Sequence, residues 1–271
     1  MLKLLDYLYL GISLPNLKKE VLDTTSYEKF KKTVLRPKSV ETNNCVWICF
    51  PGWNMSAERA QKIGFIPNEG TRIIYQGPMS LIGLNPTQTK ESLEKLKEDV
   101  LITLKEEKLD HLPIKIFGYS AGTLAAFWLS SYLKVTKVIA VSTGHKLGEG
   151  IFNSLITFEA KKLMHKAGWN KVSYDERVTE YNQENNILGI PNGEILLYAG
   201  KHDTYVPYKH SEIMHKKLEE AGKNPRFFSY DLLDHVSIIL YLGYLNKTGK
   251  DPYLLGNENL EVDTNAKLMS A

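Results

Sequence analysis

One stretch decides the predicted fold: Lys115-Ile116-Phe117-Gly118-Tyr119-Ser120-Ala121-Gly122. Its beginning, with Pro113 to Phe117, has the apolar character of a short buried strand. After it, apolar side chains recur at helical spacing at Leu124, Phe127 and Trp128, which predicts an amphipathic helix. A serine between two glycines is therefore placed at a sharp turn from strand to helix. Neighbours without a Cβ relieve crowding in such a turn, and the helix N-terminus favours negative charge at the serine.

Strand and helix patterns alternate along the chain on both sides of this turn. The expected strands are Val46–Phe50, Thr71–Tyr75, Pro113–Phe117, Lys137–Ser142, Glu194–Ala199 and Phe227–Tyr230. The expected helices are Ser56–Ile63, Leu93–Leu104, the run after Gly122, Lys209–Ala221 and Val236–Leu245. This alternation predicts an α/β fold with a mostly parallel central sheet and helices on both faces. Ser26–Leu35 fits either a strand or a short helix.

A segment without a strand signal, Thr143 to Gly193, follows the fourth expected strand. It is too long for a bare loop, and Leu155–Lys166 has helical patterning. We interpret it as a helical cap, or lid, inserted at about 143–193. The chain is then a single α/β domain over residues 1–271, with a polar, loose tail from Gly256.

Composition excludes some classes of partner. The hydrophobic content of 43% can bury a large core, and the net charge of +3 gives no reason to expect nucleic acid or an anionic membrane as the main partner. No run reaches the ~20 apolar residues of a membrane span, so no stable membrane insertion is expected. The sequence does not predict an oligomeric state.

The cysteines and the N-terminus bear on the compartment. Cys45 and Cys49 would lie about 13 Å apart along a strand, too far for a disulfide. Two buried thiols suit a reducing compartment, so we expect a cytoplasmic protein. The apolar stretch Met1–Leu14 suggests a signal peptide, but Asp6 interrupts it and no cleavage site follows. A packed N-terminal helix or a segment beside the substrate is preferred.

The pentapeptide Gly118-Tyr119-Ser120-Ala121-Gly122, with its strand and helix, resembles the nucleophile elbow of the α/β-hydrolase family, in its serine esterase, lipase and thioesterase branch. The resemblance covers roughly residues 45–245 by the order of elements. Asp203 and His235 each follow an expected strand, and the chain order Ser, Asp, His is that of the family. The resemblance implies that Ser120 is the nucleophile, His235 the general base and acid, and Asp203 the carboxylate that orients the histidine.

Other carboxylates compete with Asp203. Asp234 is adjacent to His235, but neighbours in a turn rarely meet side chain to side chain, and Asp231 belongs to the strand before it. Asp203 is preferred because of its place in the motif order.

The other histidines are assigned no catalytic role. His111 lies at the wrong edge of the sheet, and three others are expected on helix surfaces: His165, His210 and His215. His145 and His202 follow strands and could line the pocket or be loop residues satisfied by water. No pair has the spacing of a zinc site, so we expect no metal and no other cofactor.

Family members also carry an oxyanion hole. One donor would be the backbone N–H of Ala121. The resemblance implies that the other comes from the loop Phe50-Pro51-Gly52-Trp53, where Pro51 replaces the family's usual histidine and Trp53 takes the donor position. Asn54 could serve if the loop shifts. We expect Trp53, Tyr119 and Tyr205 to bind substrate, with Trp169 also near the mouth.

The implied reaction is that of a carboxylesterase. Ser120 would cleave carboxylic esters of small to medium apolar acyl groups through an acyl-enzyme. A serine at this position excludes the branches with an aspartate nucleophile. A thioesterase or an acyltransferase could use the same triad, so a thioester substrate stays open. The alternative from another class is a non-catalytic binding protein with a hydrolase fold.

Overall fold

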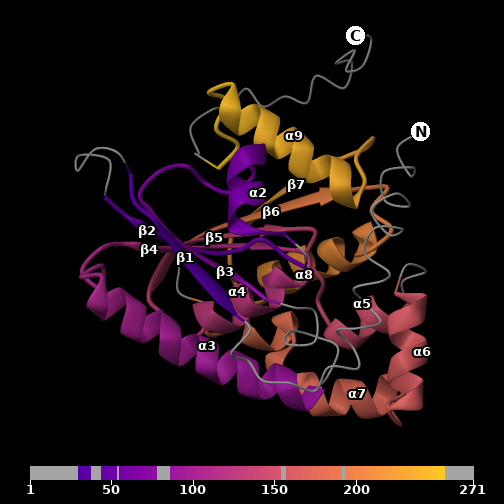
Figure 1. The fold of residues 1–271 in the computed structure, drawn as a ribbon. Helices are drawn as coiled ribbons and strands as arrows, with labels where there is room; N and C mark the ends of the chain where they lie inside the picture. The colour runs from indigo at the N-terminus through magenta and orange to yellow at the C-terminus, as the bar shows by residue number, and fades with distance from the viewer. Residues whose placement is uncertain are drawn as a thin grey trace.

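The computed structural model describes residues 30–37, 44–53, 55–77, 86–153, 157–190 and 193–253. Its strands in this part of the chain are β1 (Lys31–Leu35), β2 (Val46–Phe50), β3 (Thr71–Gln76), β4 (Ile114–Tyr119), β5 (Val135–Val141), β6 (Glu194–Gly200) and β7 (Pro225–Tyr230). They form one sheet in the order β1-β3-β2-β4-β5-β6-β7 (Figure 1). β1 pairs antiparallel with β3, and every other pair is parallel. The mostly parallel sheet is confirmed, and the described part of the undecided stretch Ser26–Leu35 contains the strand Lys31–Leu35.

Helices cover both faces of the sheet. They are α2 (Ala57–Ile63), α3 (Pro86–Glu106), α4 (Gly122–Ser130), α5 (Leu147–Asn153), α6 (Phe158–Lys166), α7 (Lys171–Val178), α8 (Tyr208–Glu220) and α9 (His235–Lys247), with short 3-10 turns η4 (Thr179–Tyr181) and η5 (Gln183–Asn186). Figure 1 shows α2 and α9 above the sheet and α3, α4 and α8 below it. Each face carries its own hydrophobic core. The carboxyl ends of the parallel strands therefore meet at one edge, where loops can collect functional side chains.

The helix after the elbow differs from the expectation. The sequence predicts an amphipathic helix, but every residue of α4 is buried. Its outer side is covered by the segment between β5 and β6, where Gln183 donates to Thr123 Oγ1 at 3.3 Å and Tyr181 packs on Trp128. Small and apolar residues all around α4 therefore match a helix enclosed on all sides.

The glycines of the elbow are required by close contacts. A Cβ added to Gly122 would lie 2.3 Å from the carbonyl oxygen of Phe50, and one added to Gly118 would lie 2.8 Å from the Cβ of Ala126. Strand β4 and helix α4 can approach each other, and the end of β2, only without these side chains. The expected relief of crowding is confirmed.

Local signals set the helix ends. Ser56 is the N-cap of α2 and accepts from Arg59 N at 3.1 Å, as the sequence predicts. Helix α9 begins at His235 because Asp234 caps it, accepting from Ser237 N at 2.7 Å. The cap is worth about 1 kcal/mol to a helix, and here it also fixes where His235 lies.

Other expectations have mixed outcomes. Cys45 and Cys49 are buried free thiols, which confirms the absence of a disulfide between them. None of the described helices is long and apolar enough to cross a membrane. The interpretations of Met1–Leu14 and of the tail from Gly256 lie outside the described residues.

The contact at Gly122 can be tested by substitution. Gly122→Ala should lower the free energy of unfolding by about 1–3 kcal/mol, because a methyl group cannot fit against the Phe50 carbonyl. Gly150→Ala is the matched control, since Gly150 lies in α5 with nothing within 4 Å of its added Cβ. The control should be neutral or stabilising by up to about 1 kcal/mol. Urea unfolding measures both, and equal effects would contradict the contact.

Candidate active site

Ser120 lies at the turn from β4 to α4 in a conformation that non-glycine residues rarely adopt. Its φ is 53°, in the left-handed region. The turn is held by neighbours on both sides, because Ser120 N donates to Val141 O at 2.9 Å and Thr123 donates from its N and its Oγ1 to Ser120 O. Strain of this kind persists only where surrounding contacts enforce it, and it is concentrated at functional sites.

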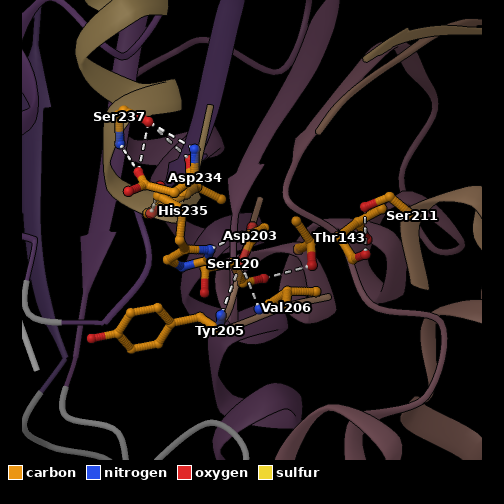
Figure 2. A network of polar contacts seen from close by, with 11 residues as sticks. Ser120, Thr143, Asp203, Tyr205, Val206, Ser211, Asp234, His235 and Ser237 are labelled. Carbon is orange, nitrogen blue, oxygen red and sulfur yellow. Dashed lines mark hydrogen bonds and ion pairs between the residues drawn. The ribbon is translucent and has the colours of Figure 1, made fainter. Parts of the chain in front are cut away.

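Asp203 and His235 meet, although 32 positions separate them in the chain. His235 Nδ1 lies 2.8 Å from Asp203 Oδ2, and both side chains are buried, with 5% and 1% exposed. The other carboxylate oxygen accepts from Tyr205 N at 3.0 Å and from Val206 N at 2.8 Å. Figure 2 shows Asp203 between the histidine ring and these two amides, with Ser120 in the same group. A carboxylate held this way favours the tautomer of His235 with its proton on Nδ1.

Two tyrosines pack on the His235 ring. The Tyr119 ring centroid lies 4.9 Å from that of His235, and the Tyr205 ring stacks on it at 4.8 Å. Tyr119 also donates from its hydroxyl to the backbone carbonyl of His235 at 2.7 Å, and only 5% of the residue is exposed. Two of the residues predicted to bind substrate, Tyr119 and Tyr205, thus contact the histidine directly, and Tyr119 helps to hold it in place.

The loop after β2 lies against the elbow. Gly52 has a φ of 88°, and an added Cβ would lie 2.9 Å from the Tyr119 ring. The following residue, Trp53, and Ala121 line the same small recess. The other described lining residues are Phe30, Phe50, Gly52, Tyr75, Gly77 and Gly122. The two residues predicted to supply the oxyanion donors, Trp53 and Ala121, thus lie at the same recess. Ala121 is at the N-terminus of α4, where backbone amides have no partner within the helix. Asn54, the alternative donor, lies outside the described residues.

The rival groups are occupied elsewhere. Asp234 caps α9, and Asp231 forms an ion pair with Lys201 at 2.6 Å. Trp169, which the sequence predicts near the mouth of the site, packs against the hydrophobic core. Among the described residues, no cluster of three or more histidine, cysteine, aspartate or glutamate side chains could hold a metal ion.

One polar pair was missed by the sequence reasoning. His210, expected on a helix surface, is buried on α8 and lies against His145 with 3.0 Å between their Nδ1 atoms. The rings stack at 5.0 Å. His210 is four residues before Met214, which is fully buried on α8, so helical periodicity could have placed it on the inner face.

Comparison with known proteins places this geometry in a family. The model of the prolyl oligopeptidase family matches residues 100–241, which include the elbow, Asp203 and His235. The chain belongs to the prolyl oligopeptidase family. Its fold is accordingly the α/β-hydrolase fold. No curated protein sequence matches the chain.

Solved structures similar to this member of the prolyl oligopeptidase family include peptidases and esterases. Pyrococcus horikoshii acylaminoacyl peptidase has 13% identity and a TM-score of 0.59 over 81% of this chain, which spans 38% of that protein. Est1E from Butyrivibrio proteoclasticus has 13% identity and a TM-score of 0.55 over 82% of this chain and 93% of its own. Acetyl xylan esterase 1 from a Thermoanaerobacterium species has 12% identity and a TM-score of 0.57 over 79% of each chain.

Such low identities show a shared fold. The family match supports a serine hydrolase and leaves open whether it acts on peptide or ester bonds.

The histidine pair makes stability depend on pH. Burial lowers the pKa of His145 to about 4, and burial also lowers the pKa of His210. Because the unfolded chain binds these protons near the ordinary pKa of 6.5, the free energy of unfolding should fall as pH falls from about 6.5 towards 4. The slope should be at most about 1.4 kcal/mol per pH unit for each proton.

Urea unfolding at a series of pH values measures this slope. His210→Gln should flatten it between pH 6.5 and 5, where most carboxylates stay ionised. His215→Gln, on the same helix beside Glu219, is the control and should leave it unchanged. A wild-type slope in His210→Gln would contradict the assignment.

Proposed function

We propose that the protein is a carboxylesterase that cleaves esters of small, apolar acyl groups. The contact between Asp203 and His235 at 2.8 Å, beside a serine at a φ of 53°, carries the proposal. A buried carboxylate, an oriented imidazole and a serine on a strained turn are the parts that a serine nucleophile requires. Family membership supports the same chemistry.

In the proposed mechanism Ser120 Oγ attacks the acyl carbonyl while His235 Nε2 takes its proton. Asp203 keeps the Nδ1 proton in place and stabilises the imidazolium that forms. The backbone N–H groups of Ala121 and Trp53 stabilise the oxyanion, each worth about 3–4 kcal/mol in the transition state. His235 then protonates the leaving alcohol, and water attacks the acyl-enzyme with the histidine again as base.

The lining of the recess beside the elbow is the argument for a small apolar acyl group. The lining residues include four aromatic ones, Phe30, Phe50, Trp53 and Tyr75. None of the described lining residues carries a formal charge, so nothing among them would pair with the ionised terminus of a peptide. Transfer from water into such a site costs less free energy for an uncharged acyl group than for a charged one.

The segment between β5 and β6 is proposed as a cap over this edge of the sheet. It follows β5 directly, and η5 within it contacts α4 through Gln183 and Thr123. Its helices pack on one another, as in the contact between Phe152 of α5 and Tyr174 of α7. The cap would belong to the same domain as the sheet.

A peptidase is the second candidate, because the family and several structural neighbours are peptidases. Esterases are also among the similar structures, since Est1E and acetyl xylan esterase 1 share the fold with TM-scores of 0.55 and 0.57.

Labelling and mutation test the triad. A fluorophosphonate should label Ser120, and Ser120→Ala should abolish labelling. Asp203→Asn should lower kcat/KM for p-nitrophenyl acetate by at least about 100-fold, because the tautomer of His235 is no longer fixed. Asp234→Asn, the matched control, leaves an oxygen to cap α9 and should lower it less than about tenfold. Absence of labelling in folded protein, or an equal loss of kcat/KM in both asparagine variants, would contradict the assignment of the triad.

A substrate panel tests the acyl group and the bond. p-Nitrophenyl acetate or butyrate should be cleaved with kcat/KM at least about tenfold above that of the decanoate, since the recess is small. Matched acyl thioesters and p-nitroanilides separate the rival activities. Faster cleavage of the anilide would make the protein a peptidase, faster cleavage of the thioester would make it a thioesterase, and transfer to an added alcohol would indicate an acyltransferase.

A further inference from the structure

A second cavity lies away from the triad, between α2, α9 and the start of β3. It has a volume of about 240 Å³. Arg72, Ile66 and Asn246 are its buried lining residues, and the more exposed ones include Gln61, Asn68 and Lys247. Helix α9 connects the two places, since His235 is its first residue and Lys247 its last. The cavity therefore lies about 18 Å along the helix from the catalytic end.

Arg72 is in an unusual position. It shares a face of β3 with Ile74, which belongs to the hydrophobic core under α2 and α9. The residue is 9% exposed, and its Nε is buried without a hydrogen-bond partner. Buried charges in proteins are normally paired, because removing a charge from water is costly.

No acid among the described residues compensates Arg72. The carboxylate of nearby Glu69 pairs with Lys115 at 2.6 Å. The thiol of Cys49 is the group that acts on Arg72 electrostatically, and burial raises the pKa of this thiol, so it is neutral. Burial also lowers the pKa of Arg72. The guanidinium is therefore a cation without a counter-charge in the part of the chain that the structure describes.

The C-terminal ends of α2 and α9 lie beside the cavity, and their last carbonyls carry partial negative charge, but Arg72 makes no hydrogen bond to them. Asn246 Nδ2 donates to the carbonyls of Gly64 and Ile66, at 2.8 and 3.0 Å. Lys247 Nζ donates to the carbonyl of Lys62 at 2.5 Å. These three carbonyls therefore accept from donors other than Arg72, and no hydrogen bond or acidic side chain among the described residues occupies the guanidinium.

We propose that this cavity binds a small phosphate, either inorganic hydrogen phosphate or the phosphate of a monoester. The described lining contains two cationic side chains, three amides and no carboxylate. A guanidinium matches the geometry of an oxyanion, and a lysine adds a point charge.

The volume agrees with such a ligand. A volume of about 240 Å³ is well above what a single water needs, so the cavity has room for a phosphate. Gln61 and Asn68 are exposed, which leaves the cavity open to solvent on their side.

An NMR titration of the full chain tests the site, with sodium phosphate compared with sodium acetate and sodium chloride at equal pH and ionic strength. Phosphate should cause saturable shifts at the amides of Gly64, Asn68, Arg72 and Asn246. Arg72→Met should weaken binding at least about tenfold, because it removes a charge-assisted hydrogen bond. Asn68→Asp, on the exposed rim, should weaken it severalfold by repulsion and does not depend on tolerance of a core change.

Lys216→Met, on the exposed side of α8, is the control and should bind phosphate as the wild type does. Three results would overturn the proposal: phosphate shifts that do not saturate, equal shifts with acetate or chloride, and unchanged affinity in Asn68→Asp together with Arg72→Met. If Arg72→Met does not fold, the rim variant alone decides.

Discussion

The packing of α4 against the end of β2 constrains the rest of the site. A side chain at Gly122 would meet the Phe50 carbonyl at 2.3 Å, so the helix can begin there only because glycine has none. Two residues before this close approach, the chain turns at Ser120 in the left-handed region, with a φ of 53°. The loop that continues from Phe50 carries Gly52 and Trp53, so the same contact also brings the proposed oxyanion donors beside Ser120.

His235 is fixed by groups from separate parts of the chain, and each limits a different freedom. Asp234 sets the first turn of α9, Tyr119 holds the His235 carbonyl, and Asp203 fixes the ring through Nδ1. The Tyr119 and Tyr205 rings limit its rotation by packing. A base arranged before substrate arrives needs little reorganisation during the reaction, which is how a site of this kind stabilises a transition state.

The sequence predicted much of this fold because its strands are short apolar runs between strong turn and capping signals. Val46–Phe50 has the predicted bounds, and Ser56 is the predicted cap. The sequence could also rank Asp203 above Asp234, because chain order and position after a strand decide the geometry. The sequence did not predict that α4 is enclosed on all sides, because the residues that cover it lie some 60 positions away in the chain. The burial of His210 could have been predicted from its spacing to Met214, but its contact with His145 could not, because His145 follows β5 and is far away in the chain.

By itself, the sequence determined the alternation of strands and helices, the elbow around Ser120 and the order of the three triad candidates. These depend on local periodicity and on residue types that a turn requires. The tertiary structure alone decided that Tyr119 supports the histidine, that two histidines share a buried contact, and that Arg72 faces a cavity without a counter-charge. Such features arise where distant segments meet, and burial and pairing are properties of the packed chain that spacing along the sequence does not contain.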